Sequence, residues 1–271
     1  MSFIFIWGMF DMLKCLRPWV FPLVLFVAFD TYVRYVAIYS DALATPAQAL
    51  LAWWDLLWLT SDEGLMRVTL FTLLTAAMGL FIGASLGLLC GLVLGLWPRI
   101  ARMSFLSIEV LRPIPSVALI PLSMMIFGFG MRMEMSVVAF ATFWPVLILT
   151  QAAVHQVEPR LLEVSKALGL NAWQRMKWII LPAMVSRLFV ALRLAVSVAL
   201  VVAVTVEIAA NPNGMGYAMM IAQQSLDPAR MIAWLLWIGV VGFAINAGAL
   251  RLQKKINQRM GVNEMQAGST A

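Results

Sequence analysis

EPRLLEVSKALGLNAWQRMKWIILP, residues 158–182, is a charged island between two long apolar segments. Its charged residues are Glu158, Arg160, Glu163, Lys166, Arg175 and Lys177. Ionisable side chains are costly inside a bilayer, so a segment with this charge density must lie in water or against another protein. We therefore expect the island to be the part of the chain that receives a signal from a partner.

The island has the pattern of two short helices joined by a tight turn. Apolar residues recur at helical spacing from Leu161 to Leu168, with charged residues on another face. Gly169 suits the C-terminal cap of the first helix, and Asn171 can cap a second helix that stops near Pro182. The functional interpretation is that this helix pair docks on a partner protein. A solvated loop between membrane spans has the same pattern, so both interpretations stay open at this point.

The composition of the whole chain is that of a polytopic membrane protein. Of its 271 residues, 63% are hydrophobic and 12% are charged, whereas ordinary globular chains carry about 25% charged residues. Cys15 and Cys90 lie far apart in apolar surroundings, which argues against a disulfide framework or a CxxC site. No cleavable signal peptide is expected, because the apolar start of the chain precedes its basic residues.

Six apolar segments are predicted to span the membrane, which makes the expected fold all-α. A span takes about 20 mostly apolar residues. The predicted spans cover residues 20–38, 68–96, 114–129, 135–154, 188–210 and 231–250. The second is long enough to tilt or to project from the bilayer, and the third is short and rich in proline. Residues 43–60 contain three tryptophans and suit a helix that lies in the membrane interface.

The basic residues set the orientation of these spans. If the island is cytoplasmic, the same side holds 15 of the 19 Lys and Arg residues. The acidic residues then expected outside are Asp41, Asp55, Asp62, Glu63, Glu134 and Asp227. The positive-inside rule places the island and both termini in the cytoplasm. This topology explains the net charge of +6, so binding to nucleic acid is not needed to account for it.

The third predicted span and its start contain three prolines. Pro113, Pro115 and Pro121 have no amide hydrogen to donate and interrupt a helix. Broken backbone at membrane depth is tolerated where protein buries it or where it lines a water-filled path. The candidates for lining a translocation path are Arg112, Pro113, Pro115 and Ser116. An ordinary kinked helix packed on its neighbours is the alternative.

Five glycines occupy every fourth position of the second predicted span. They are Gly79, Gly83, Gly87, Gly91 and Gly95. On a helix they form one groove, and small residues at this spacing let another helix approach closely in lipid. We interpret them as helix-packing residues of a compact bundle, in a contact that is either static or sliding.

A few ionisable residues fall inside the predicted spans. Asp30 and Arg34 are four residues apart and can pair within the first span. Arg193 is close enough to the cytoplasmic surface for its side chain to reach it. Glu207 lies late in the fifth span and is a further candidate for lining the path. The alternative is that Glu207 stabilises the Asn/Gly-rich turn that follows. This structural role is favoured, because a carboxylate in the path would repel an anionic substrate.

The sequence carries no pattern that predicts catalysis. It has no GxxxxGK[ST] phosphate-binding loop, so the chain is not expected to bind ATP in the usual way. His155 is its only histidine, and no grouping of His, Cys and carboxylates predicts a metal site. No catalytic residue and no metal ligand is therefore assigned.

The island resembles the cytoplasmic loop of the membrane-spanning permeases of ATP-binding-cassette (ABC) importers. In that family the loop carries a Glu-Ala-Ala run, a Gly several residues later and an Ile-x-Leu-Pro ending. The corresponding residues here are Glu163-Val164-Ser165, Gly169 and Ile179-Ile180-Leu181-Pro182, with Val and Ser in place of the two alanines. Arg112-Pro113-Ile114-Pro115, and Glu207 followed by Gly214-Met215-Gly216, are similar to the subfamily that transports nitrate, sulfonates and taurine. The resemblance covers roughly residues 67–259.

The resemblance implies the fold of a type I ABC importer permease, with six transmembrane helices and cytoplasmic coupling helices. The implied domains are residues 1–60, with the first transmembrane helix and the interfacial helix; residues 61–260, the transmembrane domain with its coupling loop at 158–182; and residues 261–271, a flexible cytoplasmic tail. The implied ATPase-coupling residues are Glu163, Ser165, Lys166, Ala167, Gly169 and Leu170. Glu163 would orient the helix pair by local hydrogen bonds or charge, and Gly169 would form the turn.

The implied complex lies in the bacterial inner membrane. It contains a second copy of this chain, two cytoplasmic ABC ATPase subunits that bind ATP and Mg²⁺, and an extracytoplasmic substrate-binding protein. This chain would hold no cofactor and perform no bond chemistry. Closure of the ATPases would move the coupling helices, and the spans would rock between inward-facing and outward-facing states. The implied substrate is a small anion such as a sulfonate, taurine, nitrate or an organic acid.

Two other classes of protein are the alternatives. An ion-coupled secondary transporter often shows repeated halves and discontinuous helices, but no convincing internal repeat is visible and acids in the spans are few. An intramembrane enzyme needs a catalytic set inside the spans, and the single histidine argues against one. Transport by the purified chain without ATPase partners would favour the secondary transporter.

Overall fold

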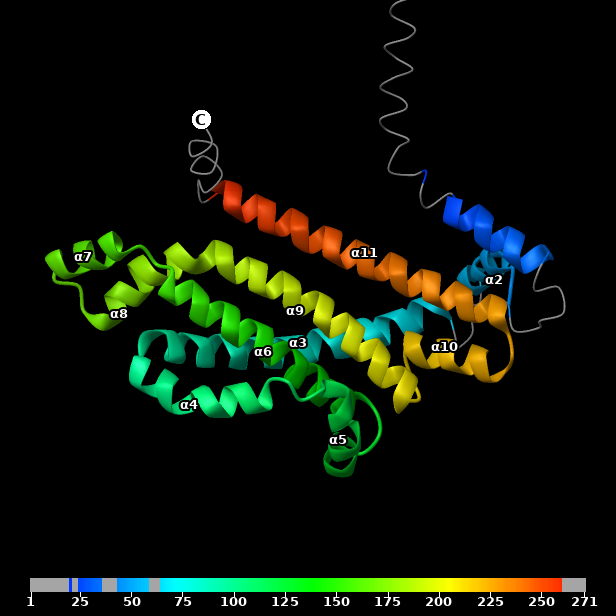
Figure 1. Cartoon of the computed structure of the whole chain (residues 1–271), viewed down its shortest axis with the longest axis horizontal. Coiled ribbons are helices and arrows are strands. Elements are labelled where there is room, and N and C mark those ends of the chain that lie inside the picture. The colour runs from blue at the N-terminus through cyan, green and yellow to red at the C-terminus, as the bar shows by residue number, and fades with distance from the viewer. Residues whose placement is uncertain (1–19, 21–23, 36–42, 59–63, 260–271) are drawn as a thin grey trace, which may run out of the picture. The chain divides into compact units, whose positions relative to one another are not determined.

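The computed structural model describes residues 20, 24–35, 43–58 and 64–259 (Figure 1). All regular structure in these residues is helical, which confirms the predicted all-α fold. The helices are α2 Pro46–Trp58, α3 Leu65–Leu96, α4 Pro98–Leu111, η1 Ser116–Leu119, α5 Ile120–Phe127, α6 Met131–His155, α7 Pro159–Ala167, α8 Ala172–Arg175, η2 Met176–Ile180, α9 Leu181–Ala209, α10 Met215–Gln224 and α11 Pro228–Arg259. Residues 24–35, inside the first predicted span, are also helical. The ends of that span and the predicted tail at 261–271 lie outside the described residues.

Four helices in the described part of the chain are long and apolar enough to cross a membrane. They are α3, α6, the continuous helix that ends with α9, and α11. A fifth crossing would combine α4 with η1 and α5, which are bent by 85° relative to each other. Of the third predicted span, residues 114–129, only η1 and α5 are helical, and the predicted interruption of the helix at its prolines is confirmed by this bend. Pro113 and Pro115 at the bend cannot donate backbone hydrogen bonds, and the separate helix α4 precedes them.

The prediction that the second island helix stops near Pro182 is wrong. α8, η2 and α9 form one continuous helix from Ala172 to Ala209. In the π-type turn η2, the Leu181 N–H donates to the carbonyl of Met176, five residues back. Proline has no N–H to give to the residue four positions back, so this wider turn lets the helix pass through Pro182 without ending.

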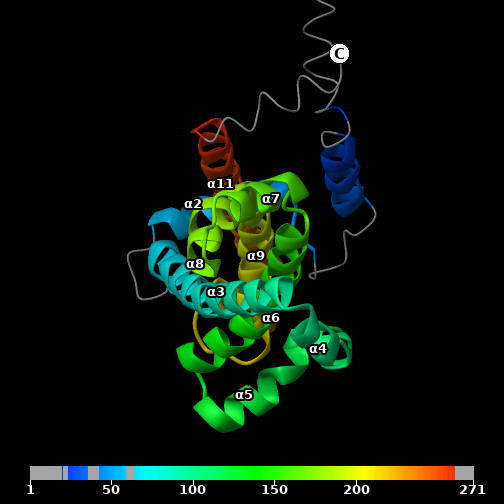
Figure 2. The same ribbon diagram turned by 90° about the vertical axis from the view of Figure 1, so that its left-hand side faces the viewer.

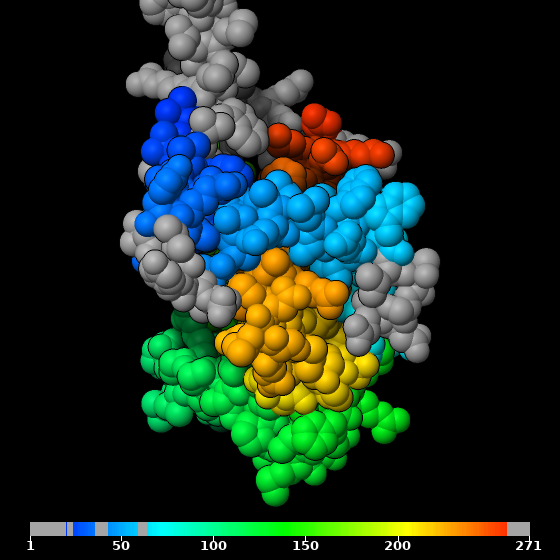
Figure 3. Space-filling view, turned by 90° about the vertical axis from the view of Figure 1, so that its right-hand side faces the viewer, coloured from blue at the N-terminus to red at the C-terminus, as the bar shows by residue number. Residues whose placement is uncertain are grey.

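The chain divides into two compact units. The larger contains Leu65–Ala218 and Ile238–Ala271, and the smaller contains Met1–Gly64 and Met219–Trp237. In the smaller unit, the ring centroids of Trp53 on α2 and Trp237 on α11 lie 6.1 Å apart. Figure 3 shows α2, in light blue, beside the orange residues at the start of α11.

Local hydrogen bonds explain why the described N-terminal segments are helical. Thr45 and Gln48 exchange side chain-to-backbone bonds that cap the start of α2. α2 lies within the stretch predicted to be an interfacial helix. In residues 24–35, Arg34 Nε lies 2.8 Å from Asp30 Oδ2, which confirms the predicted pairing of these residues.

In the larger unit, α3, α6 and α9 run side by side (Figure 1). Their shared core includes the buried residues Ala76, Met133, Val137, Val138, Ala199, Ala203 and Val206. α7 and α8 lie together beyond one end of these helices, the end that faces the viewer in Figure 2. The charged island is thus presented at one end of the bundle and does not pack along its side.

The contact between α3 and α6 is built on the five glycines. A Cβ atom added at Gly79, Gly87, Gly91 or Gly95 would lie only 2.6–2.7 Å from an atom of α6. The α6 residues that face the glycine row are Val138, Thr142, Val146, Thr150 and Val154. Both rows advance by four residues in the same direction, so the two helices run parallel and in register. Side chains at the glycine positions would force these helices apart.

Candidate functional sites

The turn between α7 and α8 is a helix cap centred on Gly169. Its φ of +65° is a left-handed conformation that glycine adopts without strain. The Gly169 N–H donates to the Lys166 carbonyl, and the Leu170 N–H donates to the Ser165 carbonyl, both at 3.0 Å. These two bonds form a Schellman motif. Four of the six predicted coupling residues therefore build the turn itself.

A capping box fixes the chain on the other side of this turn. Asn171 Oδ1 accepts from the Gln174 N–H at 2.8 Å, and Gln174 Oε1 accepts from the Asn171 N–H at 3.0 Å. Asn171 was predicted as a cap. Gln174 was not singled out, although the Asn-x-x-Gln spacing is the sequence pattern of a capping box.

The remaining predicted coupling residues differ in their surroundings. Glu163 and Ala167 are exposed on α7. Within the described residues, the Glu163 carboxylate has no hydrogen bond or ion pair, so the helix pair is held by other contacts. Ser165 is fully enclosed, and its hydroxyl donates to the Leu162 carbonyl at 2.6 Å, a bond within α7 itself.

The island carries an apolar stripe that its own chain leaves uncovered. Leu161, Val164 and Leu168 are exposed on α7, and Trp173 follows on α8. Leu168 is 67% exposed and Trp173 is 73% exposed. The neighbouring charges keep this segment out of hydrocarbon, so lipid does not cover the stripe. An exposed apolar patch of this kind is a candidate surface for contact with another protein.

The four residues of the proline-rich candidate path form the bend between α4 and η1. Arg112 closes α4 by donating its N–H to the Ile108 carbonyl at 2.9 Å, and Ala118 donates to Pro115 at 2.9 Å to start η1. Arg112, Pro113 and Pro115 are exposed, and Ser116 is half-buried. The bend turns the chain by 85°, so these residues mark an abrupt change of direction.

Glu207 is fully enclosed at the end of α9. Its Oε2 accepts from the Gly216 N–H at 2.8 Å. Gly214, with φ +93°, lies so close that a Cβ there would overlap the Glu207 carboxylate. The turn that follows α9 therefore packs directly against the Glu207 carboxylate.

A second carboxylate extends the same polar cluster. Glu134, in the first turn of α6, is fully enclosed and accepts hydrogen bonds from the Thr75 hydroxyl and the Asn211 amide. Thr72 Oγ1 accepts from the Met215 N–H at 2.9 Å. The cluster thus joins α3, α6 and the turn after α9. The sequence analysis placed Glu134 among the outer acidic residues and did not predict this role. The signal that could have identified it is its position at the start of an apolar span, where an acid needs polar partners.

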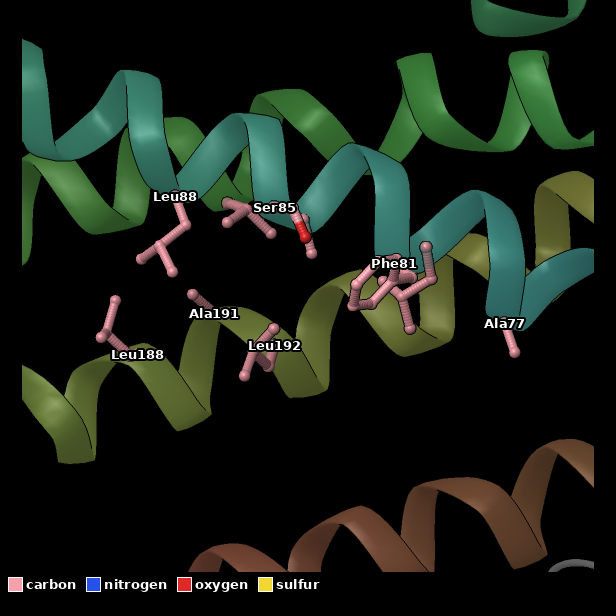
Figure 4. Close-up of a pocket in the computed structure, with 10 residues that line it drawn as sticks. Ala77, Phe81, Ser85, Leu88, Leu188, Ala191 and Leu192 are labelled. Atoms are coloured by element: carbon pink, nitrogen blue, oxygen red, sulfur yellow. The ribbon is translucent and has the colours of Figure 1, made fainter.

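An apolar cavity of about 380 Å³ lies between α3 and α9, with Val146 of α6 at its wall (Figure 4). Leu88, Leu188, Ala191 and Leu192 point into it, and Ser85 supplies the one hydroxyl among the lining residues. A hydrated anion would lose its water here with a single donor to replace it. The cavity therefore suits apolar groups and not a charged solute.

Comparison with known proteins assigns the chain to a family. The model of the family described as "Binding-protein-dependent transport system inner membrane component" matches residues 79–262, more than half of the chain. The taurine transport system permease protein TauC of Escherichia coli is 26% identical over 229 residues, which cover 83% of this chain and 82% of that protein. The nitrate import permease protein NrtB of Synechococcus elongatus is 27% identical over 189 residues, 69% of this chain and 68% of that protein.

A solved structure supports the same fold. The inward-facing MetNI methionine ABC transporter contains a chain that superposes with a TM-score of 0.65, at 17% identity, over 73% of this chain and 99% of that chain. The predicted resemblance to ABC importer permeases is confirmed by the family match. The chain belongs to the family of inner-membrane components of binding-protein-dependent transport systems and is a permease subunit of an ABC importer.

Proposed function

We propose that this permease carries a small anion, such as a sulfonate, nitrate or bicarbonate, across the inner membrane. Relatives named for taurine, nitrate and bicarbonate transport support the substrate class. The chain acts as a homodimer with its termini and island in the cytoplasm, and receives the substrate from an extracytoplasmic binding protein. It catalyses no bond chemistry, because separate ATPase subunits hydrolyse ATP.

The island acts in this proposal as the coupling element. The observation that carries it is the uncovered apolar stripe on a rigid helix pair, capped at Gly169 and Asn171 and continuous with α9. A groove on an ATPase would cover the stripe. Movement of the ATPases then passes through α8 and η2 directly into the membrane helix α9, without an intervening flexible joint.

The test uses the complex purified from its native membrane and the variant Leu168→Asp. A charge in the stripe should remove the ATPases from the purified complex and abolish uptake, while the permease still elutes as a folded protein. Leu226→Asp is the matched control, because Leu226 is also an exposed leucine and lies in the connection between α10 and α11, outside the island. Unchanged retention of the ATPases by Leu168→Asp would contradict the coupling role.

Two further predicted coupling residues, Gly169 and Glu163, extend this test. Gly169→Asp strains the left-handed turn, and Glu163→Arg reverses an exposed charge next to the stripe. Both should stop ATP-driven uptake with the protein still in the membrane. Labelled taurine, nitrate and bicarbonate, supplied with the binding protein, identify the anion.

A further inference from the structure

Arg193 places a positive charge inside a membrane-spanning helix. Near the end of α6 that leads to α7, Arg187 Nη1 donates to the Gln156 carbonyl at 3.0 Å. Arg193 follows six residues later on α9, which is about 9 Å further along the helix axis at a rise of about 1.5 Å per residue. In the predicted span 188–210 its Cα lies five residues, about 8 Å, inside the cytoplasmic edge of the hydrocarbon layer. A side chain at this depth can reach the surface, but the Nε of Arg193 is bonded to Asn246 of α11.

The partner of Arg193 is neutral. Its Nε donates to Oδ1 of Asn246 on α11 at 3.1 Å, and both residues are half-buried. Within the described ranges, the ion pairs found join Asp30 to Arg34 and Asp227 to Arg230. No carboxylate in that part of the chain compensates the charge of Arg193, and neither Nη group has an acceptor there.

A cation in this position needs an anion or water. Charged side chains within spans face a polar cavity or pair with an opposite charge, because exposure to lipid is costly. Asn246 holds the Nε edge of the guanidinium and leaves the two Nη groups free to donate. Their planar fork matches two oxygens of a carboxylate, nitrate or sulfonate group.

We propose that Arg193, oriented by Asn246, contacts the transported anion inside the membrane and selects for its negative charge. This inference rests on the proposed function, the import of a small anion. The buried side chains of Glu134 and Glu207 are carboxylates, which repel an anion when ionised, and the cavity between α3 and α9 offers one hydroxyl. Arg193 is thus better suited than either of these features to attract an anion.

The experiment measures uptake by the complete complex in proteoliposomes, with labelled taurine, nitrate and bicarbonate as probes. Arg193→Gln should lower kcat for the anion that the wild type transports by about 10- to 100-fold, the effect of losing a hydrogen-bonded charge. KM should change little, because the binding protein sets the affinity. Arg193→Lys keeps the charge but loses the fork, and should give an intermediate rate.

Arg187→Gln is the matched control. It removes the same charge from the same helix, but Arg187 contacts a backbone carbonyl at the end of α6. Its relative rates for the three anions should equal those of the wild type. ATP hydrolysis in the absence of substrate and the elution profile should be unchanged in all variants, which shows that they fold and assemble.

Asn246→Asp separates a transport role from a structural one. The new carboxylate lies beside Arg193 and should pair with it, which blocks the anion contact without lowering the unfolding midpoint. Uptake should fall as in Arg193→Gln. If Arg193→Gln and Asn246→Asp both transport within twofold of the wild type, the Arg193 inference alone is overturned. If the wild type transports none of the three anions, the proposed function falls, and this inference with it.

Discussion

At the scale of single residues, the buried cluster around Glu134 makes a testable contribution to stability. Asn211→Ala removes the amide that donates to the enclosed Glu134 carboxylate. A buried acceptor left without its donor destabilises a protein by about 1–3 kcal/mol. The variant should therefore unfold at a lower temperature, followed by tryptophan fluorescence in detergent.

Asn213→Ala is the control for this prediction. Asn213 lies two residues away in the same turn and is exposed. Surface substitutions usually stay within about 0.5 kcal/mol of the wild type. Equal unfolding midpoints for Asn211→Ala and Asn213→Ala would show that the cluster does not hold the turn after α9.

The residue-scale details could be predicted only in part from the sequence. Gly169 and Asn171 were identifiable because their turn and cap are local patterns of a few residues. The partnership of Glu134 with Asn211 joins positions far apart in the chain. It depends on how α6 and α9 pack, which no local pattern specifies.

At the scale of helices, the glycine row predicts that adding a single methyl group lowers the free energy of unfolding. A Cβ at Gly87 would lie 2.6 Å from the Phe143 carbonyl oxygen. Backbone atoms cannot rotate away, so Gly87→Ala should destabilise the bundle by about 1–3 kcal/mol. A lowered unfolding midpoint in detergent checks this.

Gly248→Ala in α11 is the comparison for the glycine row. Nothing lies within 4 Å of a Cβ at Gly248, and alanine favours a helix over glycine by up to about 1 kcal/mol. Its midpoint should be unchanged or raised. Two equal midpoints for the Gly87 and Gly248 variants would mean that α3 and α6 do not pack through the glycines.

The π-type turn before Pro182 predicts an effect on coupling without loss of stability. Pro182→Ala restores an N–H that can complete the ordinary helical ladder. The π-type turn holds one residue more than an α-helical turn, and each residue of an α-helix turns the chain by about 100°. If η2 becomes an ordinary α-helical turn in this variant, α7 and α8 rotate by about 100° relative to α9. ATP hydrolysis driven by the loaded binding protein should then fall several-fold.

Pro159→Ala is the control for Pro182→Ala, because it tests whether replacing another proline of the island also lowers coupling. Pro159 begins α7, where a missing N–H leaves no bond unmade. This variant should couple as the wild type does. Full coupling in Pro182→Ala would show that the wide turn does not set the orientation of the island.

The sequence predicted which long apolar segments are helical, but it did not predict whether a helix continues through a proline. Hydropathy predicted α3, α6, α9 and α11, because each must be apolar over its length. Proline has opposite outcomes at two sites: the chain bends by 85° near Pro113 and passes straight through at Pro182. The outcome depends on whether neighbouring turns can widen, which the proline itself does not reveal.

At the scale of the whole molecule, the proposed orientation predicts which loops face each side of the membrane. The basic residues of the island and of the C-terminal half of α11 should be cytoplasmic by the positive-inside rule. Trp173 on α8 and Asn213 in the turn after α9 are both exposed and lie at opposite ends of α9. They should therefore face opposite aqueous compartments.

Single cysteines test this orientation after Cys15 and Cys90 are changed to serine. Trp173→Cys should react with a membrane-impermeant maleimide only in inverted vesicles, and Asn213→Cys only in intact cells. A permeant maleimide labels both and controls for reactivity. Labelling of Trp173→Cys in intact cells would place the apolar stripe on the outer surface, where no ATPase can reach it, and the coupling proposal would fail with the topology.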